Sequence, residues 1–175
     1  MSLPLESYAL LGDTQSAALV SDRGSIDWLA FPRFDSPACC AALVGSPQNG
    51  HWSVAPVEAR ETKRQYRGPT LIVETTFVTP TGTALLIDCM AIERGRHHVL
   101  RIVRGLAGSV DFELTFCPRF DYGGIVPWIV SENGAITAIA GPDALALRSP
   151  VQLVLDDGGA HGTFAMSEGR HTGFR

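Results

Sequence analysis

The stretch Leu71-Ile72-Val73-Glu74-Thr75-Thr76-Phe77-Val78-Thr79 decides the fold class of this chain. Its side chains follow a period of two, which is the period of a β-strand with one buried face. The turn residues Pro80-Thr81-Gly82 follow, and the apolar segment 84–90 comes directly after them. The stretch therefore predicts two strands joined by a turn.

The same succession of strands and turns continues outward through the rest of the chain. Further strands are expected over 17–20, 25–31, 98–104, 110–117, 135–140, 144–148, 151–155 and 163–166, with weaker candidates at 50–54 and 61–66. Turn signals come about every 8–12 residues, which is typical of a β-sandwich or barrel. One segment differs, because Ser36 and Pro37 precede a small apolar run that stops at Gly45, and this predicts one short helix over 36–44. The expected class is all-β with that single helix.

The composition of the 175 residues excludes several classes of protein. Apolar residues make up 45% of the chain, which is too much for a disordered polypeptide. The net charge is −4 and Lys63 is the only lysine, so no nucleic-acid partner is expected. The longest apolar runs, such as 38–44, are far shorter than the ~18 residues of a membrane span, so no membrane partner is expected. The first residues have neither the basic nor the apolar part of a secretory leader, and the expected location is the cytoplasm.

No motif in the sequence indicates a metal or a cofactor. The four cysteines contain no Cys-x-x-Cys pair. The neighbouring His97 and His98 would point to opposite faces of a strand, so they cannot hold one metal together. The phosphate-loop, HExxH and GxSxG signatures do not occur. We therefore expect neither a metal nor a cofactor.

The most distinctive feature is a doubled tetrapeptide, since Pro32-Arg33-Phe34-Asp35 recurs as Pro118-Arg119-Phe120-Asp121. On an extended segment the arginine and the aspartate point to one side and the phenylalanine points to the other. A planar donor, a carboxylate and an aromatic plate are the groups that bind a polyhydroxylated ligand. The alternative is structural, with an arginine–aspartate pair that fastens a loop and a phenylalanine in the core.

Two tryptophans are further candidates for carbohydrate contact. Trp28 and Trp128 lie near turns or strand ends, and sugar C–H faces pack on exposed indole rings. Trp52 is expected to be buried instead.

No pair of catalytic carboxylates can be recognised in the sequence. A glycosidase needs two carboxyl groups that face each other across the scissile bond, about 5–9.5 Å apart. None of the candidates lies in a catalytic signature; they are Asp13, Asp27, Asp35, Glu74, Asp88 and Asp121. Asp88 lies in an apolar strand, and we expect it to pair locally.

Several stretches together resemble one known family. They are 8–29, which contains Gly24-Ser25-Ile26-Asp27-Trp28-Leu29, and then 32–38, 66–75, 88–90 and 118–123. These residues resemble the opening of bacterial and archaeal proteins of glycoside hydrolase family 15, the glucoamylase-like and trehalase-like enzymes. The resemblance spans essentially the whole chain.

The resemblance implies a large antiparallel β-sandwich, of the supersandwich type, at the N-terminus of a two-domain inverting α-glycosidase. In such enzymes a helical (α/α) toroid follows and carries both catalytic glutamates. We therefore expect 1–175 to be a single sandwich domain, cut near its C-terminal end, with no catalytic residue and no activity of its own. Its expected partners are that helical domain and the α-linked glucoside or trehalose that the parent enzyme hydrolyses. Candidates for the active-site rim or the domain interface are Trp28, Arg33, Phe34, Asp35, Arg119, Asp121 and Trp128.

Two other functions stay open on the sequence alone. One is a carbohydrate-binding module that stacks a glucan on Trp28 and Trp128. The other is a structural module with an apolar face that contacts a sister chain and forms a homo-oligomer.

Overall fold

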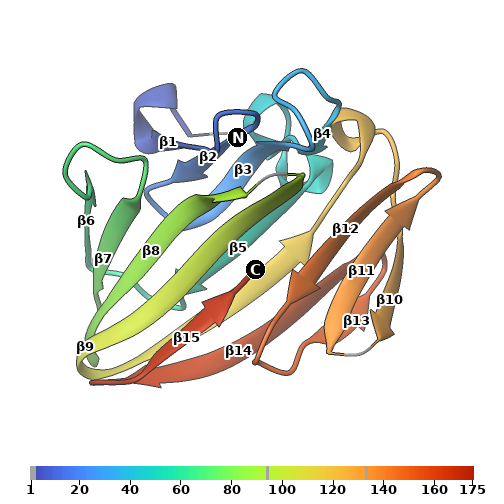
Figure 1. Ribbon diagram of the computed structural model, residues 1–175. Helices are drawn as coiled ribbons and strands as arrows, with labels where there is room; N and C mark the ends of the chain where they lie inside the picture. The colour runs from blue at the N-terminus through green and yellow to red at the C-terminus, as the bar shows by residue number, and fades with distance from the viewer. Residues whose placement is uncertain (1–2, 94, 133) are drawn as a thin grey trace.

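The computed structural model describes residues 3–93, 95–132 and 134–175, and these are mostly β-strand (Figure 1). The strands are β1 (Tyr8–Gly12), β2 (Ala17–Ser21), β3 (Ser25–Ala30), β4 (Ala38–Cys40), β5 (His51–Pro56), β6 (Glu61–Tyr66), β7 (Val73–Val78), β8 (Gly82–Glu93), β9 (Arg96–Cys117), β10 (Trp128–Glu132), β11 (Ala135–Ala140), β12 (Asp143–Arg148), β13 (Val154–Asp156), β14 (Gly159–Ser167) and β15 (His171–Phe174). Single turns of 3-10 helix are η1 (Leu5–Ser7), η2 (Ala42–Val44), η3 (Pro47–Asn49) and η4 (Asp121–Gly123). The all-β class is confirmed. Within the described ranges, no helix has the length and apolarity needed to cross a bilayer.

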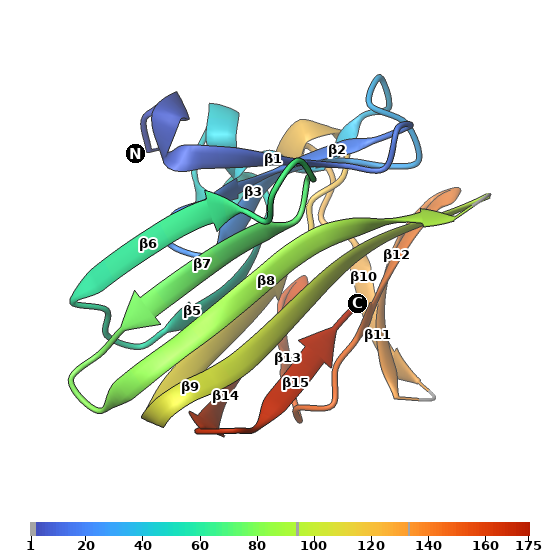
Figure 2. The ribbon, with the colours of Figure 1, turned by 60° about the vertical axis from the view of Figure 1, so that its left-hand side comes forward.

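The long strand β9 joins the two layers of the sandwich. Its first part, 96–108, pairs with β8, and beyond β8 lie β7 and β6, while β15 pairs with the opposite edge. Its last part, 109–117, lies between β5 and β14, and β3, β2 and β1 follow beyond β5. Every one of these pairings is antiparallel. The sheet is therefore folded over itself along β9, as Figure 2 shows.

The core lies between these two layers. Phe77 of β7 meets Phe112 of β9 with ring centroids 6.4 Å apart, and Trp52 of β5 meets Phe116 edge to face at 6.2 Å. All four side chains are buried, as expected for Trp52. Aromatic pairs of this geometry add about 0.5–1.5 kcal/mol each to the burial of their surface.

The strand pair predicted around residues 71–90 is present as β7 and β8. Val73, Thr75 and Phe77 alternate with half-buried neighbours, so the period of two marks the core face. The pairing runs from Val73 opposite Asp88 to Val78 opposite Thr83.

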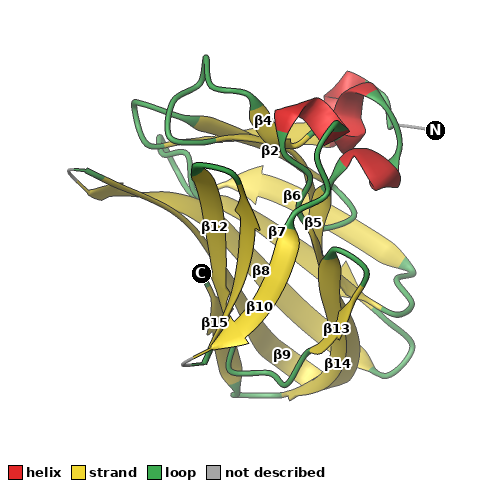
Figure 3. Cartoon of the chain, turned by 90° about the vertical axis from the view of Figure 1, so that its right-hand side faces the viewer, coloured by secondary structure: helices red, strands yellow, loops and turns green. Residues whose placement is uncertain are grey.

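A second, three-stranded sheet of β10, β11 and β12 lies beside the sandwich (Figure 3). Ile136, Ala138 and Leu147 of this sheet are buried in the same core as the main layers. Arg148 at the end of β12 exchanges two backbone hydrogen bonds with Arg175, with N–O distances of 2.7 and 3.1 Å. The small sheet is thereby attached to the end of β15.

The short helix predicted over 36–44 is wrong. Residues 38–40 form β4, which pairs with β3, and only Ala42–Val44 makes a single 3-10 turn. The run 38–42 is buried throughout, so it fills a place in a sheet and has no polar face to expose. Ser36 accepts a hydrogen bond from the amide of Arg33, so it closes the preceding loop instead of capping a helix.

Candidate functional site

Three connections meet at one end of the sandwich, which we call the loop end. They are the β1–β2 loop (13–16), the β3–β4 loop (31–37) and the segment that leads from β9 into η4 and beyond (118–124). The first two are joined directly, because the amide of Phe34 donates to the carbonyl of Gln15 at 2.9 Å. Most of the residues predicted to form a site therefore lie in one region.

The first copy of the tetrapeptide is exposed. The guanidinium of Arg33 makes a two-pronged ion pair with the carboxylate of Asp35, at 2.8 and 3.1 Å. The hydrogen bond from Arg33 holds the pKa of the Asp35 carboxyl below its ordinary value. Phe34 points into solvent and is 71% exposed. The ion pair thus fastens a loop, as the structural interpretation expects, but the phenylalanine does not enter the core.

The second copy has the same four residues, but its arginine and phenylalanine are buried. Arg119 is buried and donates through Nη1 to the carbonyls of Pro118 and Gly158, at 2.8 and 2.6 Å. Phe120 is buried in the core, whereas Asp121 is exposed at the start of η4. Among the residues that the structure describes, no ion pair joins Arg119 to Asp121. This arginine anchors the β9–η4 connection onto the turn before β14.

The two copies approach each other across β4. The amide of Arg119 donates to the carbonyl of Cys39 at 2.9 Å. Pro32 of the first copy and Phe120 and Asp121 of the second line one cavity of about 820 Å³. The other walls of this cavity include Trp52, Phe116, Gly95, the β9 segment 96–99, the β12 segment 143–148 and Arg175. Arg33, Asp35 and Arg119 are not among its lining residues.

The two candidate tryptophans occupy different environments. Trp28 on β3 is half-buried, and its ring lies 6.0 Å from the ring of Tyr122 in η4, which ties β3 to the loop end. Trp128 at the start of β10 is 72% exposed. Within the described part of the chain the two indoles make no aromatic contact with each other.

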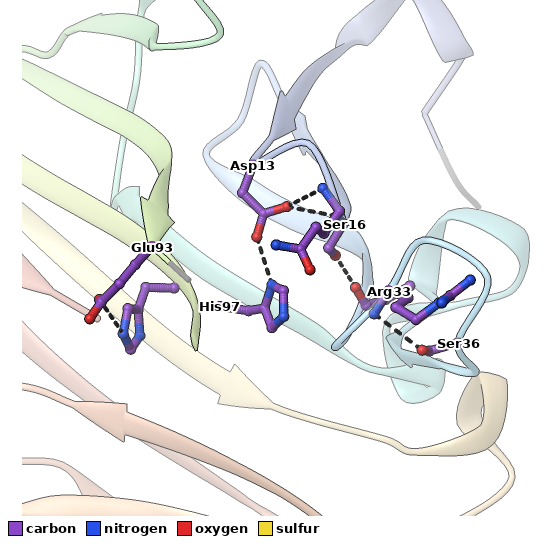
Figure 4. A network of polar contacts seen from close by, with 9 residues as sticks. Asp13, Ser16, Arg33, Ser36, Glu93 and His97 are labelled. Carbon is purple, nitrogen blue, oxygen red and sulfur yellow. Dashed lines mark hydrogen bonds and ion pairs between the residues drawn. The ribbon is translucent and has the colours of Figure 1, made fainter. Parts of the chain in front are cut away.

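One polar pair at the loop end was not predicted from the sequence. Oδ2 of Asp13 lies 2.7 Å from Nδ1 of His97, and its Oδ1 accepts from the amides of Gln15 and Ser16 at 2.9 and 2.6 Å (Figure 4). Burial favours the neutral form of this carboxyl, but the bonds from His97 and the two amides outweigh it and hold its pKa below the ordinary value. The ring of Phe31 packs 5.7 Å from the imidazole. The pair fixes the start of β9 against the β1–β2 loop.

Replacing Asp13 with asparagine is expected to lower the free energy of unfolding by about 1–3 kcal/mol at pH 7. Because the pKa of the folded state is depressed, the stabilisation is present above the ordinary value of 3.8 and is lost as the pH falls through the folded-state pKa. Urea unfolding at pH 7 and at about pH 3 should therefore show a difference between wild type and variant that shrinks in acid. The exposed Asp35→Asn is the matched control, with a small difference at both pH values. If Asp13→Asn lowers the free energy of unfolding by the same amount at both pH values, the ionised Asp13 carboxylate is not the source of the stabilisation.

Another polar group is sealed inside the sandwich. Arg101 of β9 pairs with Asp88 of β8 at 2.8 Å, and both side chains have no exposed surface. The same guanidinium donates to the carbonyls of Trp52 and Gly24 in the opposite layer, at 2.6 and 2.7 Å. It also lies 5.2 Å from the centre of the Trp52 ring. This group pins the two layers together and is out of reach of any ligand.

The described residues contain no group of three His, Cys, Asp or Glu side chains arranged to hold a metal ion. The four cysteines are free; Cys39 and Cys40 are buried, and Cys89 and Cys117 are half-buried. Burial raises the pKa of the Cys89 and Cys117 thiols, so these groups are not activated nucleophiles.

The fold and the loop end define an all-β sandwich domain whose main sheet forms two layers, with a small second sheet at its side. Comparison with protein families identifies the kind of domain more specifically. The family model described as trehalase-like, N-terminal matches residues 1–168. The chain therefore belongs to the family of trehalase-like N-terminal domains.

Curated relatives agree with this assignment. A protein named trehalase from Mycobacterium tuberculosis is 31% identical over 95% of this chain and 28% of its own length. Trehalase 1 from Sulfolobus acidocaldarius is 33% identical over 77% of this chain and 23% of its own length. The chain thus spans less than a third of the length of these relatives. No solved structure matches it.

Proposed function

We propose that this chain is the non-catalytic N-terminal accessory domain of an inverting α-glycosidase that acts on trehalose or a related α-linked glucoside. The observation that carries the proposal is the family match over residues 1–168, in a chain that covers only 28% of a relative named trehalase. The partner is the catalytic domain of the same polypeptide. The domain supports that partner and presents its loop end at the rim of the active site.

The carboxylates of the domain support a role without chemistry. Among the described residues, the buried carboxylates are Asp13 and Asp88, and each is held by a cationic or imidazole partner. The carboxylates that line the cavity, Asp121 and Asp143, are both exposed to solvent. A catalytic general acid is held in an apolar environment, and solvent-exposed positions do not supply one.

Exposed apolar side chains support a docking site for the catalytic domain on the η4–β10 connection. Tyr122, Ile125, Val126 and Trp128 on the η4–β10 connection are between 46% and 72% exposed, and Phe34 is exposed on the neighbouring loop. Large apolar groups gathered in this way are typical of interaction surfaces. Interfaces of this kind are anchored by aromatic side chains such as Trp128.

A domain exchange tests the supporting role. The segment of the M. tuberculosis relative that aligns with this chain is deleted or replaced by residues 1–175. The deletion should abolish most trehalose hydrolysis, and the replacement should restore it. A truncated relative that keeps full activity would contradict the proposal.

The double substitution Phe34→Ala and Trp128→Ala should separate docking from folding. In residues 1–175 alone, its effect on the free energy of unfolding should be within about 0.5 kcal/mol for each exposed position. In the exchanged enzyme it should lower activity and thermal stability. The matched control is Lys63→Ala, at an exposed position on β6. This variant should change neither the activity nor the thermal stability of the exchanged enzyme.

A stand-alone carbohydrate-binding module is the second candidate, favoured by the 72% exposure of Trp128. Calorimetric titration with trehalose and with maltooligosaccharides distinguishes the two functions. The accessory role predicts no binding by residues 1–175 at millimolar sugar, and saturable binding that Trp128→Ala removes would favour the module. The remaining alternative is a homo-oligomer formed through the same apolar side chains, which sedimentation detects directly.

A cytoplasmic location is part of the same proposal. Its support is chemical, since all four cysteines are free, as is usual in a reducing compartment.

A further inference from the structure

Among the described residues, no strand lies between the edge of β12 and the edge of β9 beyond the end of β15, and we call this gap the lane. Strand β15 pairs with β9 from His171 opposite Arg104 to Phe174 opposite Arg101. The next residue, Arg175, is bonded instead to Arg148 of β12. Beyond that point, the same cavity of about 820 Å³ is lined on one side by residues 96–99 of β9 and on the other by 143–148 of β12.

The backbone groups along both walls are set to receive a strand. In an antiparallel sheet the residues of one strand direct their amide and carbonyl groups to alternate sides. Gly105 bonds to Arg170 and lies two residues from Val103, so Val103, Arg101 and Val99 all present their polar groups to the β15 side. On β12, Arg148 directs its backbone amide and carbonyl to Arg175. Because the direction alternates along the strand, Ala146 and Ala144 direct their backbone amides and carbonyls into the lane as well.

The register of β15 fixes which position of a continuing strand would meet which residue. Position 176 would lie between Val99 and Leu147, and both of these side chains are buried. Position 177 would lie between His98 and Ala146, and position 178 between His97 and Leu145. Inward-facing positions therefore alternate with outward-facing ones, beginning with an apolar residue at 176.

We propose that this lane is a strand-binding site whose occupant is the polypeptide that continues β15 in the longer enzyme. The inserted strand pairs with β9 on one edge and with β12 on the other. It joins the three-stranded sheet to the main sheet and fills the cavity, so the cavity is not a sugar site. The inference rests on the proposed function only in that the domain is part of a longer chain.

Designed extensions of the chain test the lane. Residues 1–175 are extended by Val-Thr-Val-Thr-Val, which places valine at the inward positions 176, 178 and 180. One control has the alternation shifted by one position, Thr-Val-Thr-Val-Thr, and a second has proline at position 177, which removes the amide that would bond to Ala146. Urea unfolding and amide hydrogen exchange are measured on all three and on the unextended chain.

The first extension should raise the urea midpoint and slow exchange of the Ala146 and Val99 amides by about tenfold or more. The shifted and proline extensions should leave both amides close to their exchange rates in 1–175. Equal protection by all three extensions, or no protection by the first, would overturn the proposal. A dimer of unextended 1–175 with Ala146 already protected would overturn it as well, because a second copy would then occupy the lane. None of these readouts involves sugar or activity, so failure here is distinct from failure of the accessory role.

Discussion

Replacing Arg101 with methionine is expected to destabilise the chain by about 3–5 kcal/mol, because it leaves the Asp88 carboxylate buried without its cation. The guanidinium also bonds the carbonyls of Trp52 and Gly24, so the substitution removes polar contacts on both layers of the sandwich. For a domain of this size, such a loss takes most of the free energy of folding. Guanidinium unfolding followed by tryptophan fluorescence measures it.

Two further variants show whether the burial of the pair is the cause. Arg33→Met removes the same kind of ion pair at the surface and should change the free energy of unfolding by less than about 1 kcal/mol. Asp88→Leu combined with Arg101→Met removes both charges and should recover part of the loss, but not the bonds to the two carbonyls. If Arg101→Met unfolds no more easily than Arg33→Met, the buried contacts of Arg101 between the two layers do not stabilise the fold.

Gly24→Ala is the second substitution with a large expected effect, about 3 kcal/mol or more. Gly24 has a φ of +80°, and an added Cβ would collide with the carbonyl oxygen of Val54 in the adjacent strand. It would also press on Leu86 and Phe77 in the core. Gly24→Ala therefore combines the cost of an alanine at positive φ with the cost of the steric clash.

Gly68→Ala is the matched control for this glycine. Gly68 has a φ of +54°, and an added Cβ would meet nothing within 4 Å. This variant should lose only the conformational cost, about 1–2 kcal/mol. Equal losses for both variants in urea unfolding would mean that the contact with Val54 does not constrain the turn.

The sequence was informative wherever a period of two has one buried face. The alternation of Val73, Thr75 and Phe77 predicted β7, and the turn at 80–82 predicted the connection to β8. It failed at 36–44, because five consecutive small residues carry no period and only tertiary packing decides between helix and strand. A strand is expected at 151–155, but the structure has the shorter β13, which begins only at Val154. Ser149 binds the backbone of Val151 and holds the preceding chain in a turn.

The candidate site was predictable only in part. The repeat of Pro-Arg-Phe-Asp could be found by inspection, but the opposite burial of Phe34 and Phe120 depends on which neighbouring strand each copy meets. The pair of Asp13 and His97 joins residues 84 positions apart, and no local pattern marks it. The partner of Asp88 could have been found, because a hairpin that pairs Glu93 with Arg96 places Arg101 directly opposite Asp88.

One assay decides whether this domain supports a glycosidase without performing its chemistry. Purified residues 1–175 are incubated with trehalose, and released glucose is followed by an enzyme-coupled readout. We expect no glucose above the buffer blank, from a sample whose circular dichroism confirms a folded β-protein. Steady glucose release that Asp121→Asn or Asp143→Asn abolishes would contradict it.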